Sequence, residues 1–343
     1  MTDNLANRRL KAGKLPPELL ASFLGELGPP AKRILLGPGV GEDAAFISFG
    51  SSTLIAKSDP ITFATDRIGW YAVQVNANDI AASGGTPKWF LATLLLPENE
   101  PASTAKEIFG QLQRAADELG IALIGGHTEI TVGLPRPIIS GTMLGEAAPS
   151  ETLKTASATP GDDIILTAGI AIEGTAIIAR ESTAELLNAG LSEADIARAA
   201  DYLDTPGISV VNAARVAAGK GYVTAMHDPT EGGLAGALDE MARASGTGIT
   251  VDAERVTVLP ETSRICNALK LDPWGLLASG ALLITTNPEG TGDIITALAD
   301  KGIPASVIGK ITGPGDGLQR VVNRVTGPLP RFDRDEIARF YGA

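Results

Sequence analysis

A helix with almost no polar face is predicted between residues 67 and 83. Ile, Val, Trp, Tyr and Ala occupy most of its positions, and the Gly-Gly pair at 84–85 ends it. We expect Thr65 or Asp66 to cap its first turn, because both side chains can accept hydrogen bonds from the free N–H groups there. Such a helix must be covered on nearly all sides by other parts of the chain. It therefore predicts a buried central element around which the remaining elements pack.

Asn76, Asp79 and Ser83 form one polar stripe on this helix, because they are spaced at i, i+3 and i+7. An ionised carboxylate without a partner in a protein core costs several kcal/mol. Asp79 is therefore either hydrogen-bonded to the surrounding structure or a ligand of a cation. The helix alone leaves both interpretations open, but similar acidic positions recur elsewhere in the chain.

Glu42 and Asp43 follow a glycine-rich segment at 37–41. The residues after this segment, AFISF, are typical of a strand, whereas a dinucleotide-binding or Walker loop must open a helix. No G-x-x-x-x-G-K-[ST] motif occurs in the chain, which excludes a P-loop. The structural alternative is a tight connection between strands, with both acids exposed.

Both histidines of the chain lie in acidic segments that contain glycine. His127 and Glu129 belong to GGHTEIT, which we interpret as a glycine-rich turn between two strands, where backbone can approach a ligand closely. A surface turn without function is the alternative. His227 and Asp228 precede the glycines at 232–233, which open an amphipathic helix. Here the alternative is that these two residues only cap that helix.

The composition fits a two-domain protein that would bind anions only at particular sites, through bound cations or backbone N–H groups. The chain has 343 residues, 44% of them hydrophobic, and a net charge of −12. This charge opposes non-specific binding of nucleic acids, which depends on Lys and Arg. A single cysteine, Cys266, excludes an internal disulfide framework and fits a reducing compartment. Because neither a signal-peptide core nor eighteen consecutive apolar residues occur, we expect a cytoplasmic protein without membrane spans.

Strands alternate with helices in both halves of the sequence, which predicts an α/β (α+β) fold with two layered domains. We expect an N-terminal arm and helix over 1–34, a first domain over 35–155 and a second over 156–325. A C-terminal helix is expected over 326–343.

Six motifs, in this order and spacing, together resemble the AIR synthase (PurM) superfamily, and most closely its HypE-like, AIR-synthase-related members. They are GVGEDAAFI, KSDPITF, NANDIAASGGTP, GGHTEIT, PGDDIIL and HDPTEGGLAGALDEMA. The resemblance spans residues from about 35 to 315. It implies a PurM-like fold with an N-terminal α/β domain whose sheet pairs with that of a second copy in a homodimer. It also implies a C-terminal α+β domain and an ATP site in the cleft between the domains.

The resemblance further implies roles for particular residues. The expected Mg²⁺ ligands are the acids of four motifs, Asp43, Asp59, Asp79 and Asp228. The residues expected to bind the nucleotide or the second substrate are Asp59, Asn76, His127, Thr128 and Glu129. The residues expected to take part in catalysis are Asp79, His127 and Glu129. Separated carboxylates of this kind can hold magnesium around a triphosphate.

The implied activity is the ATP-dependent phosphorylation or activation of an amide- or acid-like oxygen of a small or protein-borne acceptor. HypE works on a cysteine at its own C-terminus, whereas this chain reads ARFYGA there and has only Cys266 upstream. A HypE-like nucleotide-binding protein that assists hydrogenase maturation by docking, with little turnover, is therefore the alternative. The resemblance does not identify the acceptor.

Overall fold

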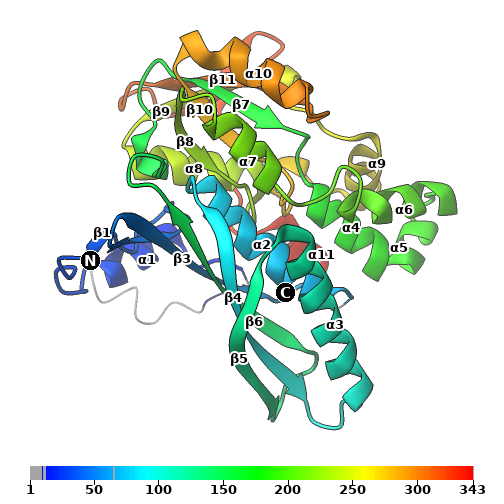
Figure 1. Cartoon of the computed structure of the whole chain (residues 1–343). Helices are drawn as coiled ribbons and strands as arrows, with labels where there is room; N and C mark the ends of the chain where they lie inside the picture. The colour runs from blue at the N-terminus through cyan, green and yellow to red at the C-terminus, as the bar shows by residue number, and fades with distance from the viewer. Residues whose placement is uncertain (1–9, 11–12, 65, 343) are drawn as a thin grey trace.

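Two domains, each built on its own sheet, make up this computed structural model, which describes residue 10 and residues 13–64 and 66–342. Figure 1 shows the first domain in blue to green in the lower part of the view and the second domain above it. The predicted two-domain α/β fold is confirmed. No helix within the described ranges combines the length and the apolar character needed to cross a bilayer.

The first domain contains a six-stranded sheet in the order β1-β2-β3-β6-β4-β5. Its strands are β1 (Ile34–Leu36), β2 (Ala45–Phe49), β3 (Ser52–Ile61), β4 (Thr86–Pro97), β5 (Ala122–Thr131) and β6 (Ile138–Ala147). All neighbours are antiparallel except β4 and β5. Helices α2 (Ile68–Ala82) and α3 (Ala102–Leu119) pack against each other and against the sheet, while α1 (Pro17–Leu24) precedes it. The sheet thereby gives one face to a core.

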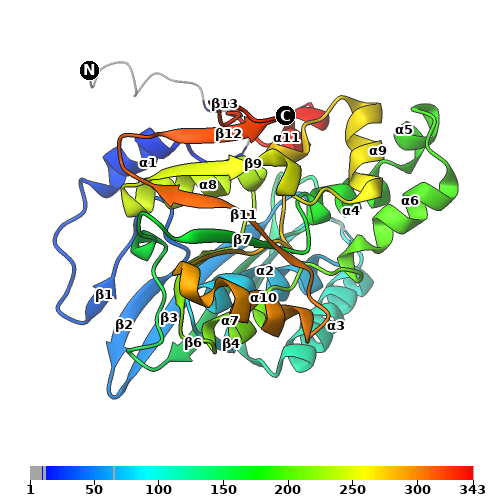
Figure 2. The same ribbon diagram turned by 90° about the horizontal axis from the view of Figure 1, so that it is seen from above.

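The second domain contains a seven-stranded sheet in the order β13-β12-β9-β11-β7-β10-β8. Its strands are β7 (Asp163–Thr167), β8 (Val223–His227), β9 (Gly248–Asp252), β10 (Leu283–Thr286), β11 (Ala305–Thr312), β12 (Leu318–Val322) and β13 (Val325–Pro328). Its helices are α4 (Ile172–Glu181), α5 (Thr183–Asn188), α6 (Glu193–Ala200), α7 (Val211–Ala218), α8 (Gly233–Ser245), α9 (Pro260–Leu269), α10 (Thr291–Ala299) and α11 (Glu336–Phe340). Figure 2 shows this sheet from above, with α4, α5, α6 and α9 grouped at one side.

Helices cover both faces of this second sheet, which explains why the three central residues of strand β7 are all apolar. Ile164 and Leu166 pack in the cluster formed with α8, whereas Ile165 packs in the cluster formed with α7 and α10. Successive side chains of a strand point to opposite faces, so a strand buried on both faces needs apolar residues in succession.

Helix α2 is buried, as its sequence predicts, and it lies between the two domains. Every residue of the helix except Trp70 is buried. The Asn78 side chain donates to the carbonyl of Ile208 at 2.8 Å and accepts from the N–H of Val210 at 2.8 Å. These bonds join the first domain to the second, which explains a helix with no solvent face.

The predicted N-terminal cap of α2 is wrong for Asp66, while Thr65 lies outside the described residues. Arg67 precedes the helix in the left-handed conformation, with φ 53°, and its side chain does not cap the helix. In the first turn, the N–H of Gly69 donates to Oε1 of Gln111 at 3.0 Å. Asp66 instead accepts a hydrogen bond from Arg180 of α4 at 2.6 Å. The predicted end is confirmed, because Gly84 follows the helix at φ 80°.

The C-terminal segment differs from the single helix expected over 326–343. Residues Val325–Pro328 form β13, and only Glu336–Phe340 are helical. Asp335, just before α11, is buried and accepts hydrogen bonds from the N–H groups of Gly232 and Leu277 at 2.6 and 3.2 Å. This segment is therefore tied to the second domain near its contact with the first. Most of the arm expected before α1 lies outside the described residues.

Candidate functional site

Three buried carboxylates from three separate elements meet where the two domains face each other. Asp43 precedes β2, Asp79 lies on α2 and Asp228 follows β8. One oxygen atom of each lies within 4.8 Å of one oxygen of each of the others. Their exposed fractions are 7%, 2% and 2%. We call these three residues the acid cluster, and the structure thus brings together three of the four predicted metal ligands.

The loop that carries Asp43 is held against α8 by Gly41. This glycine has φ 84°, and a Cβ atom there would lie 2.4 Å from the carbonyl oxygen of Glu240. Only glycine permits both the conformation and this close approach. The structural alternative, in which Glu42 and Asp43 are exposed, is wrong, because Asp43 is buried and Glu42 accepts hydrogen bonds from the N–H groups of Thr155 and Ala156.

Lys57 provides a positive charge beside the acid cluster. Its Nζ lies 2.9 Å from Oδ1 of Asp79 and 3.4 Å from Oδ2 of Asp59. Burial alone would lower the pKa of Lys57, but the charges of Asp79, Asp59 and Asp43 outweigh it and raise that pKa above its usual value. Lys57 is therefore held as a cation. Asp59 follows it on the same face of β3, because residues two apart on a strand point the same way.

His227 links Asp43 to a second carboxylate. Its Nδ1 lies 2.6 Å from Oδ1 of Asp43, and its Nε2 lies 3.0 Å from Oε2 of Glu240. Both ring nitrogens face carboxylate oxygens, so both donate only when the ring is an imidazolium. Burial would lower the pKa of His227, yet Asp43 and Glu240 raise it well above its usual value. The interpretation of His227 and Asp228 as helix caps is wrong, because the His227 ring faces Asp43 and Glu240 and neither Asp228 oxygen accepts an N–H of α8.

Glu240 also forms an ion pair with Lys14, because Nζ of Lys14 lies 3.0 Å from Oε1 of Glu240. Burial would raise the pKa of Glu240, but Lys14 and His227 lower it to about 2. The order Asp43, His227, Glu240, Lys14 thus alternates in charge, and it fixes Asp43 in place.

Several carboxylate oxygens of the acid cluster have no hydrogen-bond partner in the part of the chain that the structure describes. Oδ2 of Asp79 and both Oδ atoms of Asp228 are buried without a hydrogen bond. Burial, and next the charge of Asp43, raises the pKa of Asp228 to about 8. Burial likewise raises the pKa of Asp79, which Lys57 opposes. Unpartnered carboxylate oxygens grouped in this way fit a divalent cation, and Mg²⁺ prefers such oxygen ligands.

Asn76 does not face an open site, contrary to the expectation that it contacts the nucleotide. It is fully buried; its Oδ1 accepts from the N–H of Asp59 at 2.9 Å, and its Nδ2 donates to the carbonyl of Ala72 at 2.9 Å. Nδ2 also lies 3.3 Å from the carbonyl oxygen of Asp59. Asn76 therefore positions the backbone of Asp59, whose own side chain is about one-third exposed.

The predicted turn at GGHTEIT is wrong, because these residues belong to strand β5. Gly126 has φ 145°, and a Cβ there would lie 1.9 Å from the carbonyl oxygen of Ala92, so glycine lets β5 approach β4. His127, Thr128 and Glu129 therefore lie on the edge strand, separated from β3 by β6 and β4. The structure does not bring them to the acid cluster of the same chain.

Lys57, Lys14 and Glu240 are charged residues of this site that the sequence interpretation missed. Only Lys57 could have been found from the sequence, because it lies two residues before Asp59 on a strand and therefore points to the same face. Lys14 and Glu240 gave no such signal, since they approach only through the packing of the N-terminal segment on α8.

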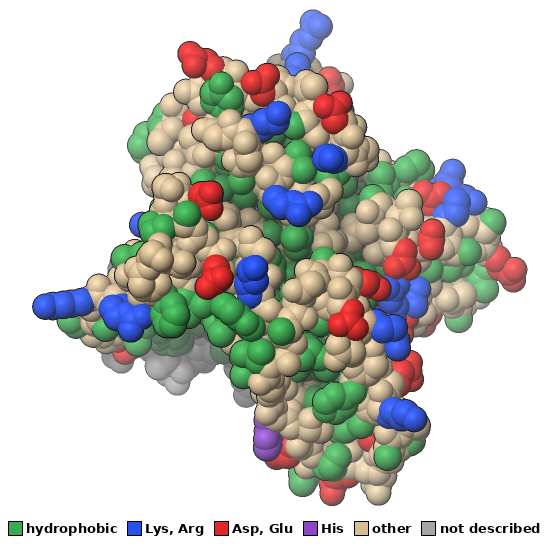
Figure 3. Space-filling model, viewed as in Figure 1, with side chains coloured by type: hydrophobic (Ala, Val, Ile, Leu, Met, Phe, Trp, Pro, Cys, Tyr) green, Lys and Arg blue, Asp and Glu red, His purple; other side chains and the backbone are tan. Residues whose placement is uncertain are grey.

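Acidic and basic side chains are interspersed on the face shown in Figure 3, without a continuous basic patch. This agrees with the acidic net charge, and it fits an anion site that depends on the buried groups described above.

Comparisons with known proteins agree with this architecture. Models of the N-terminal and C-terminal domains of AIR synthase related proteins match residues 41–147 and 159–320. The carbamoyl dehydratase HypE of Azotobacter vinelandii is 30% identical over 257 residues, which cover 74% of this chain and 72% of that protein. HypE of Rhizobium leguminosarum bv. viciae is 27% identical, covering 84% and 81%. Thiamine-monophosphate kinase of Pyrococcus horikoshii is 29% identical, covering 74% and 79%.

Solved structures share the two-domain fold. A HypE structure in complex with ATP superposes with a TM-score of 0.71 at 22% identity, covering 92% of this chain and 91% of that chain. A HypE–HypF complex gives 0.71 at 22% identity, covering 85% and 94%. AaThiL complexed with AMPPCP and TMP gives 0.70 at 20% identity, covering 92% and 94%.

Proposed function

The chain belongs to the family of AIR synthase related proteins, and we propose that it is an ATP- and Mg²⁺-dependent enzyme. In this proposal, ATP phosphorylates or activates an amide- or acid-like oxygen of an acceptor. The observation that carries the proposal is the acid cluster, with its buried and unpartnered oxygens contributed by both domains. Buried carboxylates without partners are costly, so their grouping calls for a ligand.

Asp43, Asp79 and Asp228 would hold the magnesium, with Asp59 beside them. Bound there, it would offset the negative charge of the phosphates and of the phosphoryl group in transfer. Lys57 keeps Asp79 and Asp59 in place through its two ion pairs. His227 does the same for Asp43, because its ring is clamped between Asp43 and Glu240. The chain thus supplies a prepositioned set of oxygens.

The relatives support an ATP-using activity but differ in their acceptors, since their names include a carbamoyl dehydratase and a thiamine-monophosphate kinase. Cys266 is not a suitable acceptor in this chain. Its side chain is buried, and burial, followed by Asp272 and Glu336, raises the pKa of the thiol to about 12. A thiol in that state is a poor nucleophile. The acceptor would therefore be a group other than this thiol.

Calorimetric titration with a non-hydrolysable ATP analogue tests the proposal. Binding to the wild type should require Mg²⁺ and should be lost in Asp79→Asn. The exposed Asp293 of α10 offers a matched control, and Asp293→Asn should bind as the wild type does. No binding to the wild type, or equal binding by Asp79→Asn, would contradict the proposal.

A second candidate is a nucleotide-binding hydrogenase maturation partner that works by docking to another protein. It is favoured by the buried state of Cys266 and by the HypE–HypF complex among the similar structures. It requires nucleotide-dependent complex formation with negligible ATP turnover. Turnover with a small acceptor in the absence of any other protein would decide against it.

We also propose a homodimer formed through the first domain. Ser58 and Pro60 of β3 are exposed on the sheet face opposite α2, and Ile124 and Ile130 are exposed on the edge strand β5. Apolar side chains on a strand whose outer edge is unpaired favour pairing with a second copy. A role of His127, Thr128 and Glu129 at the nucleotide would then require that they face the site of that second copy. Sedimentation equilibrium would show the dimer.

A further inference from the structure

The loop at residues 228–232, which we call the β8–α8 loop, carries Asp228 to the acid cluster and leads into α8. Neither Oδ atom of Asp228 has a hydrogen-bond partner in the described chain, so hydrogen bonds do not hold this side chain in place. Gly232 and Gly233 both have left-handed backbone conformations, with φ 88° and 63°. The position of Asp228 therefore depends on how the backbone of this loop is supported.

The segment at residues 274–278 supports the β8–α8 loop by direct backbone contact. A Cβ atom on Gly233 would lie 2.5 Å from the carbonyl oxygen of Trp274, so only glycine lets the two segments approach this closely. The N–H of Ala278 donates to the carbonyl of Thr230 at 3.3 Å. The loop and this segment thus form one packed unit.

Asp335, which is buried, accepts hydrogen bonds from the backbone of both segments. Its Oδ2 accepts from the N–H of Gly232 at 2.6 Å, and its Oδ1 accepts from the N–H of Leu277 at 3.2 Å. Oδ1 also accepts from the N–H of Ile337 at 2.8 Å. Burial raises the pKa of Asp335 to about 6, although these N–H groups lower it, so the carboxylate is ionised at pH 8. Hydrogen bonds to an ionised acceptor are about twice as strong as those between neutral groups, so Asp335 holds the two segments firmly together.

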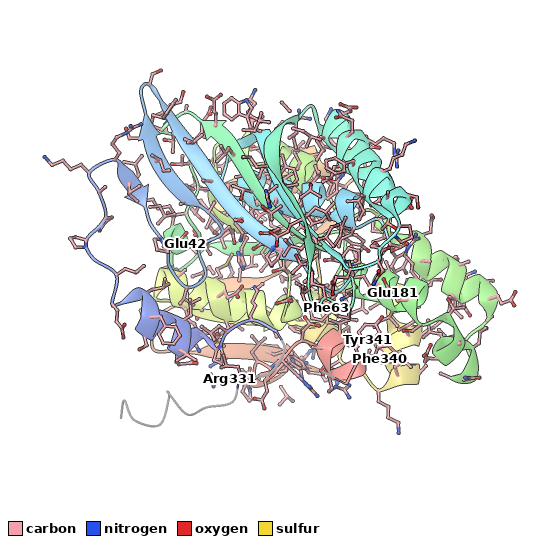
Figure 4. The ribbon with its side chains drawn as sticks, turned by 90° about the horizontal axis from the view of Figure 1, so that it is seen from below. Glu42, Phe63, Glu181, Arg331, Phe340 and Tyr341 are labelled. Carbon is pink, nitrogen blue, oxygen red and sulfur yellow. The ribbon has the colours of Figure 1, made fainter. Side chains whose placement is uncertain are left out.

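Asp335 lies in the segment at residues 331–340, which we call the C-terminal strap. The end residues of the strap, Arg331 and Phe340, are labelled in Figure 4. Glu336, the next residue of the strap, bonds instead to another part of the second domain. Within the described chain, only Asp335 links the strap to the β8–α8 loop by a hydrogen bond.

We propose that Asp335 is a positioning residue of the magnesium site, and that it fixes the β8–α8 loop so that Asp228 meets the other two acids of the cluster. This inference rests on the proposed function, because it takes the acid cluster as the Mg²⁺ site. Asp335 is not a metal ligand here; it acts through the N–H groups of the backbone. Mg²⁺ demands nearly ideal octahedral geometry, so a loop that is held less firmly binds it more weakly. The C-terminal strap is thereby part of the site, although it lies far from Asp228 in the sequence.

Binding of Mn²⁺ tests this role, because Mn²⁺ takes the same oxygen ligands as Mg²⁺ and electron paramagnetic resonance measures the free ion. Asp335→Asn should lower the affinity for Mn²⁺ about tenfold or more, since one of its two side-chain positions would carry an NH₂ group that cannot accept from an N–H. Mg²⁺ should compete with Mn²⁺ for the wild type.

Glu336→Gln is the matched control, since Glu336 is the adjacent buried acid of the same strap. Glu336 accepts from the N–H of Asp272 at 2.8 Å and pairs with Arg339 at 2.7 Å, but among the described residues it is not bonded to the β8–α8 loop. Glutamine keeps an acceptor for Asp272, so this variant should bind Mn²⁺ within about twofold of the wild type. Urea unfolding with EDTA measures the stability that each substitution costs. A general loosening of the strap would not confine the loss of affinity to Asp335→Asn.

Hydrogen exchange on the wild type gives a second measurement that needs no variant. Coupling between two sites is reciprocal, so Mg²⁺ should slow the exchange of the Ile337 N–H, which bonds to Asp335. Residues 318–322 of β12 are the reference, and their exchange should be the same with Mg²⁺ and with EDTA.

Unchanged Mn²⁺ affinity in folded Asp335→Asn, an equal loss in Glu336→Gln, or exchange at Ile337 that does not respond to Mg²⁺ would overturn the inference. If Asp335→Asn does not fold, the exchange measurement decides the question. Absence of Mn²⁺ binding by the wild type would overturn the proposed function together with this inference. Wild-type binding that Asp335→Asn retains in full would overturn this inference alone.

Discussion

Single charged residues decide the chemistry of this site, because they are buried close to one another. Lys57 and His227 each contact two carboxylates. Removing one partner of a buried ion pair typically costs about 3–5 kcal/mol, since the other charge is left without compensation. Substitutions here should therefore change stability as well as ligand binding.

Lys57→Met should destabilise the protein by about 3 kcal/mol in the absence of divalent metal, because Asp79 then loses the one ion-pair partner it has among the described residues. Denaturant unfolding with EDTA measures this loss. Adding Mg²⁺ should recover part of it, since the metal supplies positive charge to the same oxygens. Lys106→Met, at an exposed position of α3, is the control and should change stability little. Equal stability of the two variants would contradict the assignment.

His227→Gln should lose stability in a pH-dependent way. The pKa of His227 in the folded protein is raised above its unfolded value, so the imidazolium stabilises the fold fully below about pH 6.5. That contribution declines as the pH rises through the raised folded pKa. The difference between wild type and variant, measured by urea unfolding with EDTA, should therefore be greatest at pH 6 and smaller at high pH. A difference that grows with pH would contradict a cationic His227.

Glu173→Gln should stabilise the protein at pH 8. The pKa of Glu173 is raised to about 7 by burial, so the wild type loses stability as the pH rises from the unfolded value of 4.5 through that value. The difference corresponds to about 3 kcal/mol above pH 7, and it should vanish near pH 4. Urea unfolding at both pH values measures it. A destabilised variant at pH 8 would show that Glu173 has a structural partner.

At the scale of elements, the sequence predicted helix α2, which is determined by burial. It did not predict strand β5, where glycine determines the backbone conformation. Helix α2 was predictable because an apolar surface on all sides can only be buried. Strand β5 was not, because GGHTEIT contains the residues of a turn, and only the contact of Gly126 with Ala92 shows that the glycines serve close strand pairing. The C-terminal helix was overestimated for a different reason, since Val325–Pro328 form a strand through their pairing with β12, which local sequence does not show.

The sequence predicted the acids of the candidate site but not the charged residues that pair with them. Asp43, Asp79 and Asp228 were found through motifs, but Lys14 and Glu240 meet only through tertiary packing. Asn76 was assigned to the nucleotide through the resemblance to the family. A motif cannot show that both ends of its amide are used by the backbone of Asp59.

Asn78→Ala should weaken the attachment of α2 to the second domain. Both hydrogen bonds of this amide to the backbone of Ile208 and Val210 would be lost, leaving two buried backbone groups unpaired. The expected cost is about 2–4 kcal/mol. Hydrogen exchange should show faster exchange around residues 208–210. The exposed Gln113 of α3 is a control, and Gln113→Ala should leave that region unchanged.

At the scale of the whole molecule, the acid cluster joins the two domains. Asp43 and Asp79 come from the first and Asp228 from the second. A cation that binds all three therefore stabilises the contact between the domains and not only one of them. Ligands of the folded state raise its stability by mass action, by about 2.7 kcal/mol at a hundredfold excess over Kd.

Mg²⁺ should therefore raise the midpoint of thermal unfolding by several degrees, and both domains should unfold in one transition when it is bound. Calorimetry with Mg²⁺ and with EDTA measures this. Asp228→Asn should abolish the shift although it alters only the second domain. A shift that persists in this variant would place the metal elsewhere.

Because the three carboxylates are divided between the domains, neither half could have acquired this site independently. A mutation that displaces Asp228 would have to be matched by one near Asp43 or Asp79, in the other domain. The two halves are thus bound to a shared evolutionary history, and chimaeras that take one domain from a distant relative should fold more readily than they bind metal.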